Sequence, residues 1–193
     1  MNSDQMLKQV FEDGRTHRIF TDAPVDEGLL HRLYDLAKMA PSASNLCPMR
    51  ITFVQSKTQK QKVIEAAAEG NKPKIDSAPV VAIIAHDAKF YNHIEKLAPH
   101  MNADAFRQQE KHTLEQIAIE NCWLQAGFFI AAARSLGLDC GPMSGFDKAR
   151  IDEGFYQGSS WRSDFLMNLG YGDASKLHPR GHRLNFDEAC SIL

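Results

Sequence analysis

The longest pattern in the chain runs from about Leu114 to Leu136, where apolar residues occupy nearly every face of a helix. Gly137 follows, and glycine commonly ends helices. A helix that is apolar all round must be buried on most sides. A single subunit of this size rarely encloses a helix so fully, so the pattern predicts that this helix lies at the interface of a homodimer.

Shorter patterns predict further elements. A helix should begin after Asp26, which can cap it, and end before Pro41. Strands are predicted at residues 50–55, 79–85 and 164–172, and other helices at 3–13, 57–69, 147–157 and in the tail. Residues 87–112 show no clear pattern, and "DCGPMSGF" at 139–146 is interpreted as a glycine-rich turn. Helices and strands intermix without a strict repeat, so we expect one domain (1–193) of the α+β or α/β class, with a mixed central sheet flanked by helices.

Composition narrows the class of protein. The 193 residues are 44% hydrophobic and 24% charged, which is typical of a globular domain. A formal net charge of −2 provides no field that would attract nucleic acid or an anionic membrane. The first residues are acidic and polar where a signal peptide would be apolar, and the most apolar run, residues 123–133, is too short to cross a bilayer. We therefore expect a cytoplasmic protein.

Cysteine and histidine spacing does not indicate a metal centre or a disulfide framework. The cysteines are widely scattered, with no closely spaced pair: Cys47, Cys122, Cys140 and Cys190. Pro99 would interrupt any helix that aligned the three evenly spaced histidines, His86, His93 and His100. We expect buried or solvated side chains here and no bound metal.

Two glycine-containing segments fail as known motifs. "GYGD" at 170–173 lacks the third glycine of a dinucleotide fingerprint and lies too near the end of the chain. Ser144 is preceded two positions earlier by Pro142, where a nucleophile elbow requires glycine. Neither a Rossmann site nor an acyl-transfer serine is therefore predicted.

Four other segments offer what a planar, anionic ligand needs. "RTHR" at 15–18 supplies two arginines and a hydroxyl, and arginine pairs with phosphate through parallel N–H donors. Arg180 and Arg183 can add charge to the same group. "PSASNLCP" from Pro41 offers hydroxyl and amide groups, and "GPMSG" at 141–145 offers main-chain amides with little side-chain cover. Solvated surface charges, local capping and a plain turn are the alternative interpretations.

In this order, the segments resemble the nitroreductase-like flavin reductases over nearly the whole chain. The run of "RTHR", "PSASN", a long apolar helix, a glycine-rich turn, "GYG" and a terminal arginine carries the resemblance. "GPMSGFD", "NLGYGDASKL" and "FDEACSIL" are most similar to the branch of malonic semialdehyde reductases, which act in pyrimidine breakdown.

The resemblance implies a homodimer that binds FMN between its subunits and uses NADH or NADPH as the hydride donor. Arg15, Thr16 and Arg18, with Arg183 and Arg180, would hold the phosphate. Pro41, Ser42 and Asn45 would touch the ring and ribityl across the dimer, and Asn71 would reach the flavin through its amide. The turn behind the ring would be Pro142, Met143, Ser144 and Gly145.

This sequence departs from the family pattern in two places. Many members carry two basic residues before the hydroxyl, whereas Gly14 precedes Arg15 here. Many carry Gln-Pro-Trp after the asparagine, whereas this chain has Cys47-Pro48-Met49, which opens one edge of the pocket. Without that aromatic residue the pocket lacks a platform for stacking a nitroaromatic or a quinone. A small acceptor such as malonic semialdehyde, reduced to 3-hydroxypropionate, needs no such platform.

The cofactor carries the chemistry, so no catalytic acid, base or nucleophile is predicted. A carboxylated acceptor would need a nearby cation, and the candidates are Arg50, Arg107 and Arg162. Three alternatives stay open: a broad-range nitroaromatic or quinone reductase, a flavin-binding module without turnover, and a dimeric scaffold with an empty pocket.

Overall fold

In the computed structural model, which describes residues 2–193, four strands form one sheet in the order β1-β2-β4-β3. The strands are β1 (Met49–Val54), β2 (Val80–Asp87), β3 (Asp139–Met143) and β4 (Trp161–Gly170). Every neighbouring pair is antiparallel, and an isolated parallel bridge joins Thr16 to Cys140 beside β3. The predicted combination of helices with a central sheet is confirmed.

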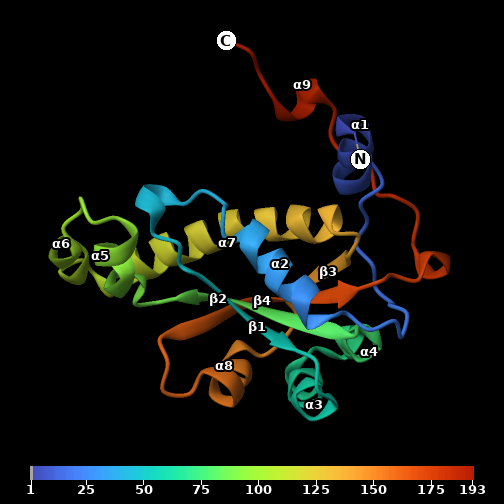
Figure 1. Ribbon diagram of the computed structural model, residues 1–193, viewed down its shortest axis with the longest axis horizontal. Helices are drawn as coiled ribbons and strands as arrows, with labels where there is room; N and C mark the ends of the chain where they lie inside the picture. Colours follow the sequence, from blue (N-terminus) through green and yellow to red (C-terminus); the bar gives the residue numbers. More distant parts are fainter. Residues whose placement is uncertain (1) are drawn as a thin grey trace.

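Helices cover both faces of this sheet (Figure 1). α2 (Glu27–Ala37) and α7 (Lys111–Ser135) lie on one face, and α3 (Lys57–Ala66), α4 (Lys72–Ser77) and α8 (Lys148–Tyr156) lie on the other. The short elements are α1 (Ser3–Leu7), a π-helical turn η1 (Lys8–Glu12), η2 (Ala43–Asn45), η3 (Glu69–Asn71), η4 (Phe90–His93), α5 (Ile94–Leu97), α6 (Ala103–Arg107), η5 (Ala174–Lys176) and α9 (Phe186–Ala189).

β2 runs through the centre of the core, with all of its residues buried. Val80, Ala82 and Ile84 pack on the side of α2 and α7, and the alternate residues pack on the side of α3 and α8. This two-sided burial explains why its sequence is a continuous apolar run.

The long helix α7 begins three residues earlier than its apolar pattern and ends as predicted, with Gly137 at a φ of +80°. That left-handed conformation favours glycine. The polar first turn, Lys111–Thr113, is exposed, which is why the apolar pattern missed it. Trp123, Leu124 and Phe128 form an exposed apolar row along the helix, with exposed fractions of 53%, 47% and 46%.

The predicted glycine-rich turn at 139–146 is wrong for its first five residues, which form strand β3. Among the strands β3 pairs with β4 alone, and its other edge carries the single bridge from Cys140 to Thr16. Proline lacks a main-chain N–H, so Pro142 is tolerated in an edge strand although it would weaken a central one. Ser144 and Gly145 follow the strand as a connection to α8.

Other boundaries moved for local reasons. The helix predicted at 57–69 ends at Ala66, because Ala67 turns to an extended conformation and bridges Phe146. α4 begins beside Pro73 and was not predicted. The unassigned stretch 87–112 contains three short helical segments, too short to show a periodicity.

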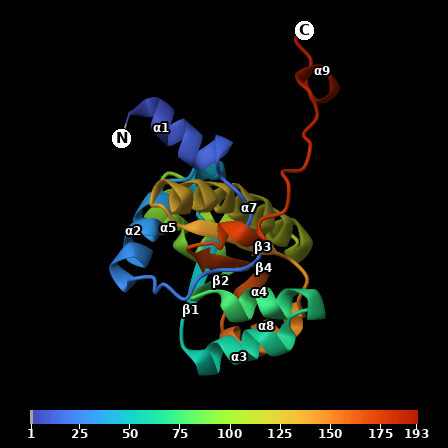
Figure 2. The same ribbon diagram turned by 90° about the vertical axis from the view of Figure 1, so that its right-hand side faces the viewer.

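The C-terminal tail, including α9, extends away from the layers on the side where α1 also leaves them (Figure 2). Leu184, Phe186, Ile192 and Leu193 are exposed along it. Within the described residues, we find no helix with the length and apolarity needed to span a membrane.

Candidate functional site

A basic cavity of about 480 Å³ lies where the segment after η1 meets the C-terminal tail. Its walls include five residues that the sequence singled out: Arg15, Thr16, Arg18, Arg180 and Arg183. Two guanidinium groups hold the segments together, since Arg15 donates to the carbonyl of His178 and Arg180 donates to that of Glu12 at 2.5 Å. The fold thus joins residues that lie more than 160 positions apart in the chain.

The arginines of this cavity have no carboxylate bonded to them within residues 2–193. No aspartate or glutamate lines the cavity, and its four named arginines form no ion pair in the part of the chain that is described. Arg18 Nη1 lies 3.1 Å from His178 Nε2, and Arg183 Nη1 bonds to two nearby carbonyls at 3.0 Å. Neutral partners leave the cationic charge uncompensated, so the cavity is suited to a phosphate or another compact anion. Lys176 and Arg134 also line it and were not singled out from the sequence.

The Pro41–Asn45 loop lies elsewhere, against the middle of α7. Ser42 Oγ accepts from the N–H of Cys47 at 3.0 Å, and Asn121 of α7 accepts from the N–H of Ala43 at 2.7 Å. Asn45 donates from Nδ2 to the carbonyl of Leu97 at 2.7 Å, so its amide is partly committed within the protomer.

The backbone of this loop is strained. Ser44, Asn45 and Cys47 have φ values of +48°, +58° and +43°. Such left-handed conformations cost free energy in residues other than glycine, and they concentrate at functional sites. The positive φ values, together with the anchoring to α7, show a loop held in a fixed shape.

Asn71 and Gly145 meet on the opposite face of the sheet. Asn71 donates from Nδ2 to the carbonyl of Gly145 at 3.0 Å, and a Cβ at position 145 would lie only 2.8 Å from that nitrogen. Lys74 donates to Asn71 Oδ1 at 2.8 Å. Lys74 was missed from the sequence, although its spacing of one helical turn from Asn71 was the signal that could have found it.

An apolar cavity of about 340 Å³ reaches Ser144, the residue before Gly145, from the side of α7. Pro142, Met143 and Ser144 form one wall, and residues of α7 and β4 complete it: Trp123, Ala126, Gly127, Ile130 and Phe165. The rings of Trp123 and Phe165 meet edge to face, with centroids 5.6 Å apart. No charged side chain lines this cavity, so it is suited to a flat apolar group.

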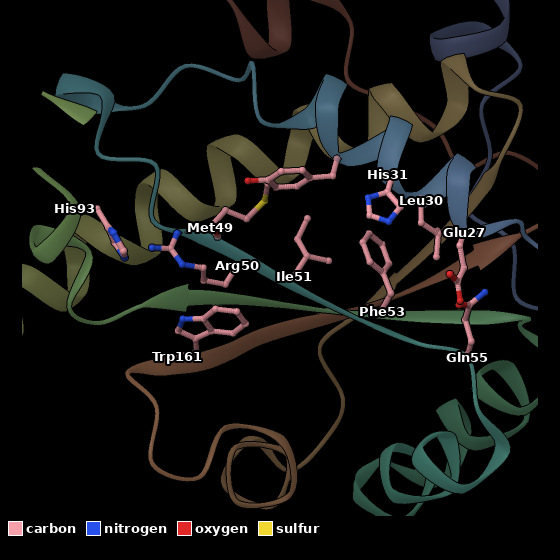
Figure 3. A pocket seen from close by; sticks show the side chains of 11 residues that line it. Glu27, Leu30, His31, Met49, Arg50, Ile51, Phe53, Gln55, His93 and Trp161 are labelled. Atoms are coloured by element: carbon pink, nitrogen blue, oxygen red, sulfur yellow. Dashed lines mark hydrogen bonds between the residues drawn. The ribbon is translucent and has the colours of Figure 1, made fainter. Parts of the chain in front are cut away.

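A cavity of about 870 Å³ lies between α2 and the open edge of β1 (Figure 3). Leu30, Ile51 and Phe53 face it from one end, and Arg50, His93 and Trp161 from the other. It contains none of the residues predicted to bind the cofactor, but it does contain Arg50, a predicted ligand for an acceptor carboxylate.

Arg50 is already bonded within the chain. Its Nη2 lies 2.8 Å from Asp87 Oδ2, and its Nη1 donates to the carbonyls of Cys47 and Met49. Burial alone would raise the pKa of Asp87, but hydrogen bonds from Ser160 Oγ and the Lys89 N–H, with the nearby charges of Arg50 and His93, hold this pKa below its ordinary value. We conclude that Arg50 fixes the residues between the Pro41–Asn45 loop and β1.

The other two candidate arginines are also engaged. Arg107 pairs with Asp104 at 2.7 Å and Glu95 at 3.3 Å, and hydrogen bonds to these carboxylates raise its pKa. Arg162 donates to the carbonyls of Ser159 and Trp161. Neither arginine lines the basic cavity, the apolar cavity or the cavity beside α2.

The histidines and cysteines are dispersed. His86 is buried and lies 3.0 Å from Asp164 through its Nδ1, while His93 lies 3.6 Å from Asp87. Within the described chain, no three side chains of histidine, cysteine, aspartate or glutamate converge as metal ligands. All four cysteines carry free thiols, and burial raises the pKa of Cys140 to about 12.

Comparison with known proteins places these features in context. The profile described as "Nitroreductase family" matches residues 13–171. A Stenotrophomonas maltophilia protein is 48% identical over 96% of this chain and 95% of its own length, and a Polynucleobacter asymbioticus protein is 43% identical over 99% and 97%. Both are named "Putative NADH dehydrogenase/NAD(P)H nitroreductase".

Solved structures share the fold. A "putative nitroreductase in complex with FMN" from Exiguobacterium sibiricum superposes with a TM-score of 0.86 at 16% identity, covering 100% of this chain and 98% of that one. At that identity the likeness concerns the arrangement of helices and strands alone.

Proposed function

The chain belongs to the nitroreductase family, and from that premise we propose that it is an FMN-dependent NAD(P)H oxidoreductase. The observation that carries the proposal is the basic cavity, where Arg15, Arg18, Arg180 and Arg183 converge without a carboxylate. Relatives at 48% and 43% identity are named NAD(P)H nitroreductases, which supports a nicotinamide as the hydride donor. A solved structure with the same fold contains FMN, which supports FMN as the cofactor.

The residues of the basic cavity fit a phosphate ester. Several guanidinium groups and the hydroxyl of Thr16 can each contribute a charge-assisted or neutral hydrogen bond to phosphate oxygens. Their present partners are carbonyls and one imidazole, which occupy only part of the five N–H donors of each guanidinium. FMN, unlike riboflavin, would therefore be retained through its phosphate.

The residues around Gly145 fit the ring of a flavin. Asn71 uses one of its two amide N–H donors on Gly145 and keeps the other for a ligand. Lys74, fixed against Asn71, places a cation beside the same position and would stabilise negative charge there. The apolar wall of Trp123 and Phe165 can exclude water from a flat ligand.

Bound FMN would supply two-electron transfer between NAD(P)H and the acceptor. The chain's own part is to bind the phosphate, to align the ring against the Pro142–Gly145 segment and to provide fixed donors and a cation near it. No side chain of the protein has to act as a nucleophile.

We propose that the functional unit is a homodimer joined through α7. Trp123, Leu124 and Phe128 leave an apolar row on its surface. Asn121, which anchors the Pro41–Asn45 loop, and Arg134, which lines the basic cavity, are separated by about 20 Å along the helix at about 1.5 Å per residue. A second copy packed across α7 would bring its own loop beside the cavity of the first, so that both chains complete each site.

The acceptor has two candidates. The motif resemblance supports malonic semialdehyde, which would be reduced to 3-hydroxypropionate. The engagement of Arg50, Arg107 and Arg162 in other bonds supports a second candidate, a flat uncharged acceptor such as a quinone or nitroaromatic, because the apolar cavity has no cation for a carboxylate.

Four free thiols fit an enzyme of the reducing cytoplasm.

The test begins with the purified protein. We expect it to be yellow, to release FMN on denaturation and to be bleached by NADH or NADPH in the absence of oxygen. Reoxidation by malonic semialdehyde, a quinone and a nitroaromatic then ranks the acceptors by kcat/KM. A colourless protein that binds neither FMN nor riboflavin would support an empty scaffold, and a yellow protein that NAD(P)H does not bleach would support a binding module.

A further inference from the structure

Arg134 reaches the basic cavity from the C-terminal end of α7, far in sequence from the other arginines that line it. Its Nη1 donates to the carbonyl of Val10 in η1 at 3.0 Å. Its Nε is buried and has no hydrogen-bond partner within residues 2–193. A buried donor without a partner costs free energy, which indicates that an acceptor belongs beside it.

Gly14 makes room for this guanidinium. A Cβ at position 14 would lie 2.7 Å from Arg134 Nη1, 2.8 Å from its Cζ and 2.6 Å from the carbonyl oxygen of Val10. All three separations are too short for a carbon atom to occupy without displacement. The space where a side chain would stand, directly before Arg15, is therefore filled by a cation supplied from α7.

Arg134 also forms no ion pair with a carboxylate in the described chain. It shares a neighbouring cavity with Asp13 and Asp139, and Asp139 faces His17 at 3.4 Å and accepts from the N–H of Gly172 at 2.9 Å. The C-terminal end of α7 carries partial negative charge, which would repel an anion if Arg134 did not offset it.

We propose that Arg134 is a ligand for the phosphate group that the basic cavity binds, and that Gly14 is the position that admits it. The proposal deepens the function proposed above and rests on it where the phosphate is that of FMN. The alternative role is structural: Arg134 would only brace η1 against α7 through Val10.

Flavin binding to the apoprotein separates these roles. Arg134→Gln should weaken FMN binding about tenfold or more, as for loss of a charge-assisted bond, and leave riboflavin binding unchanged. Arg134→Lys should restore part of the preference for FMN. Arg150→Gln is the matched control, because Arg150 is an exposed arginine on α8, paired with Glu65 at 2.8 Å, and its loss removes the same charge. The proposal would be overturned if Arg134→Gln left the ratio of FMN affinity to riboflavin affinity unchanged, whether both affinities fell equally or neither fell.

A measurement on the wild type guards against a variant that does not fold. Phenylglyoxal modifies arginine, and inorganic phosphate should slow modification of Arg134, mapped by mass spectrometry, while chloride at equal ionic strength should not. Modification of Arg150 is the internal reference. Phosphate protection of Arg134 in a protein that binds no flavin would retain the anion site and reject FMN as its ligand. An Arg134 modified at the same rate with and without phosphate would reject the site itself.

Discussion

The Arg50–Asp87 pair gives the sharpest test of how the loop beside β1 is held. Asp87 is almost fully buried, and Arg50 keeps 18% of its side chain exposed. Removing one partner of a buried pair costs about 3–5 kcal/mol. Asp87 keeps its bonds to Ser160 Oγ at 2.6 Å and to the Lys89 N–H at 2.9 Å, so we place Arg50→Met at the lower end, about 3 kcal/mol of unfolding free energy.

Urea denaturation at pH 7, with FMN at a fixed excess, measures this loss. Arg162→Met on β4 is the control, because within the described residues that arginine bonds to surface carbonyls and should change stability by about 0.5 kcal/mol or less. Arg50→Met within about 1 kcal/mol of the wild type would refute the reasoning. A raised KM for malonic semialdehyde with unchanged stability would instead mean that Arg50 binds the acceptor carboxylate.

The pH dependence has a defined sign. Despite its burial, Asp87 has a pKa below its ordinary value because Ser160, the Lys89 N–H and Arg50 favour the carboxylate. A carboxyl group with a lowered folded pKa stabilises the fold fully above its unfolded pKa of about 3.9, and this contribution is lost as the pH falls through the folded pKa. The stability gap between wild type and Arg50→Met should therefore be constant near neutrality and shrink below about pH 4.

Three further predictions concern the cofactor, the dimer and the core. Arg15→Ala should weaken FMN binding by about 1.5–3 kcal/mol, roughly 10- to 150-fold, and spare riboflavin; equal loss for both would assign Arg15 to folding. Phe128→Asp should place an unpaired charge in the α7 interface and yield monomers by sedimentation at micromolar concentration, whereas a wild type that already sediments as a monomer would contradict the dimer. Tyr156→Phe should cost about 1 kcal/mol in urea denaturation by removing the 3.0 Å bond to Thr52, and an unchanged midpoint would show that this bond contributes nothing.

Strong local patterns predicted the elements that tertiary contacts merely reinforce. The apolar run of β2 and the long pattern of α7 with its terminal glycine are visible in the sequence because burial on several sides leaves few polar positions. β3 was missed because its glycine and proline are typical of turns, and only its place at the sheet edge makes them tolerable. α4 was missed because six residues are too few to show a helical period.

The candidate site was predictable as a set of residue types and not as a geometry. Sequence motifs singled out Arg15, Arg18, Arg180 and Arg183, and the fold brings all four to one cavity. Lys74 and Arg134 carry no motif of their own, and their relevance follows from contacts with Asn71 and Gly14 that only the folded chain makes. Arg50 is the opposite case: the sequence singled it out as a possible substrate ligand, but the folded chain pairs it with the buried Asp87.

The construction of the basic cavity links ligand binding to the position of the tail. Arg15 and Arg180 hold residues 178–180 against residues 12–15 through carbonyls, and these bonds lie at the exposed surface, where each contributes little on its own. Four converging cations repel one another, which opposes the docking of the tail while no anion is present. A bound phosphate would replace this repulsion between cations by attraction to the anion. By mass action it would stabilise the docked tail more as more of the cavity is occupied. The tail is a wall of the cavity, and we expect it to be better ordered when the cavity holds an anion.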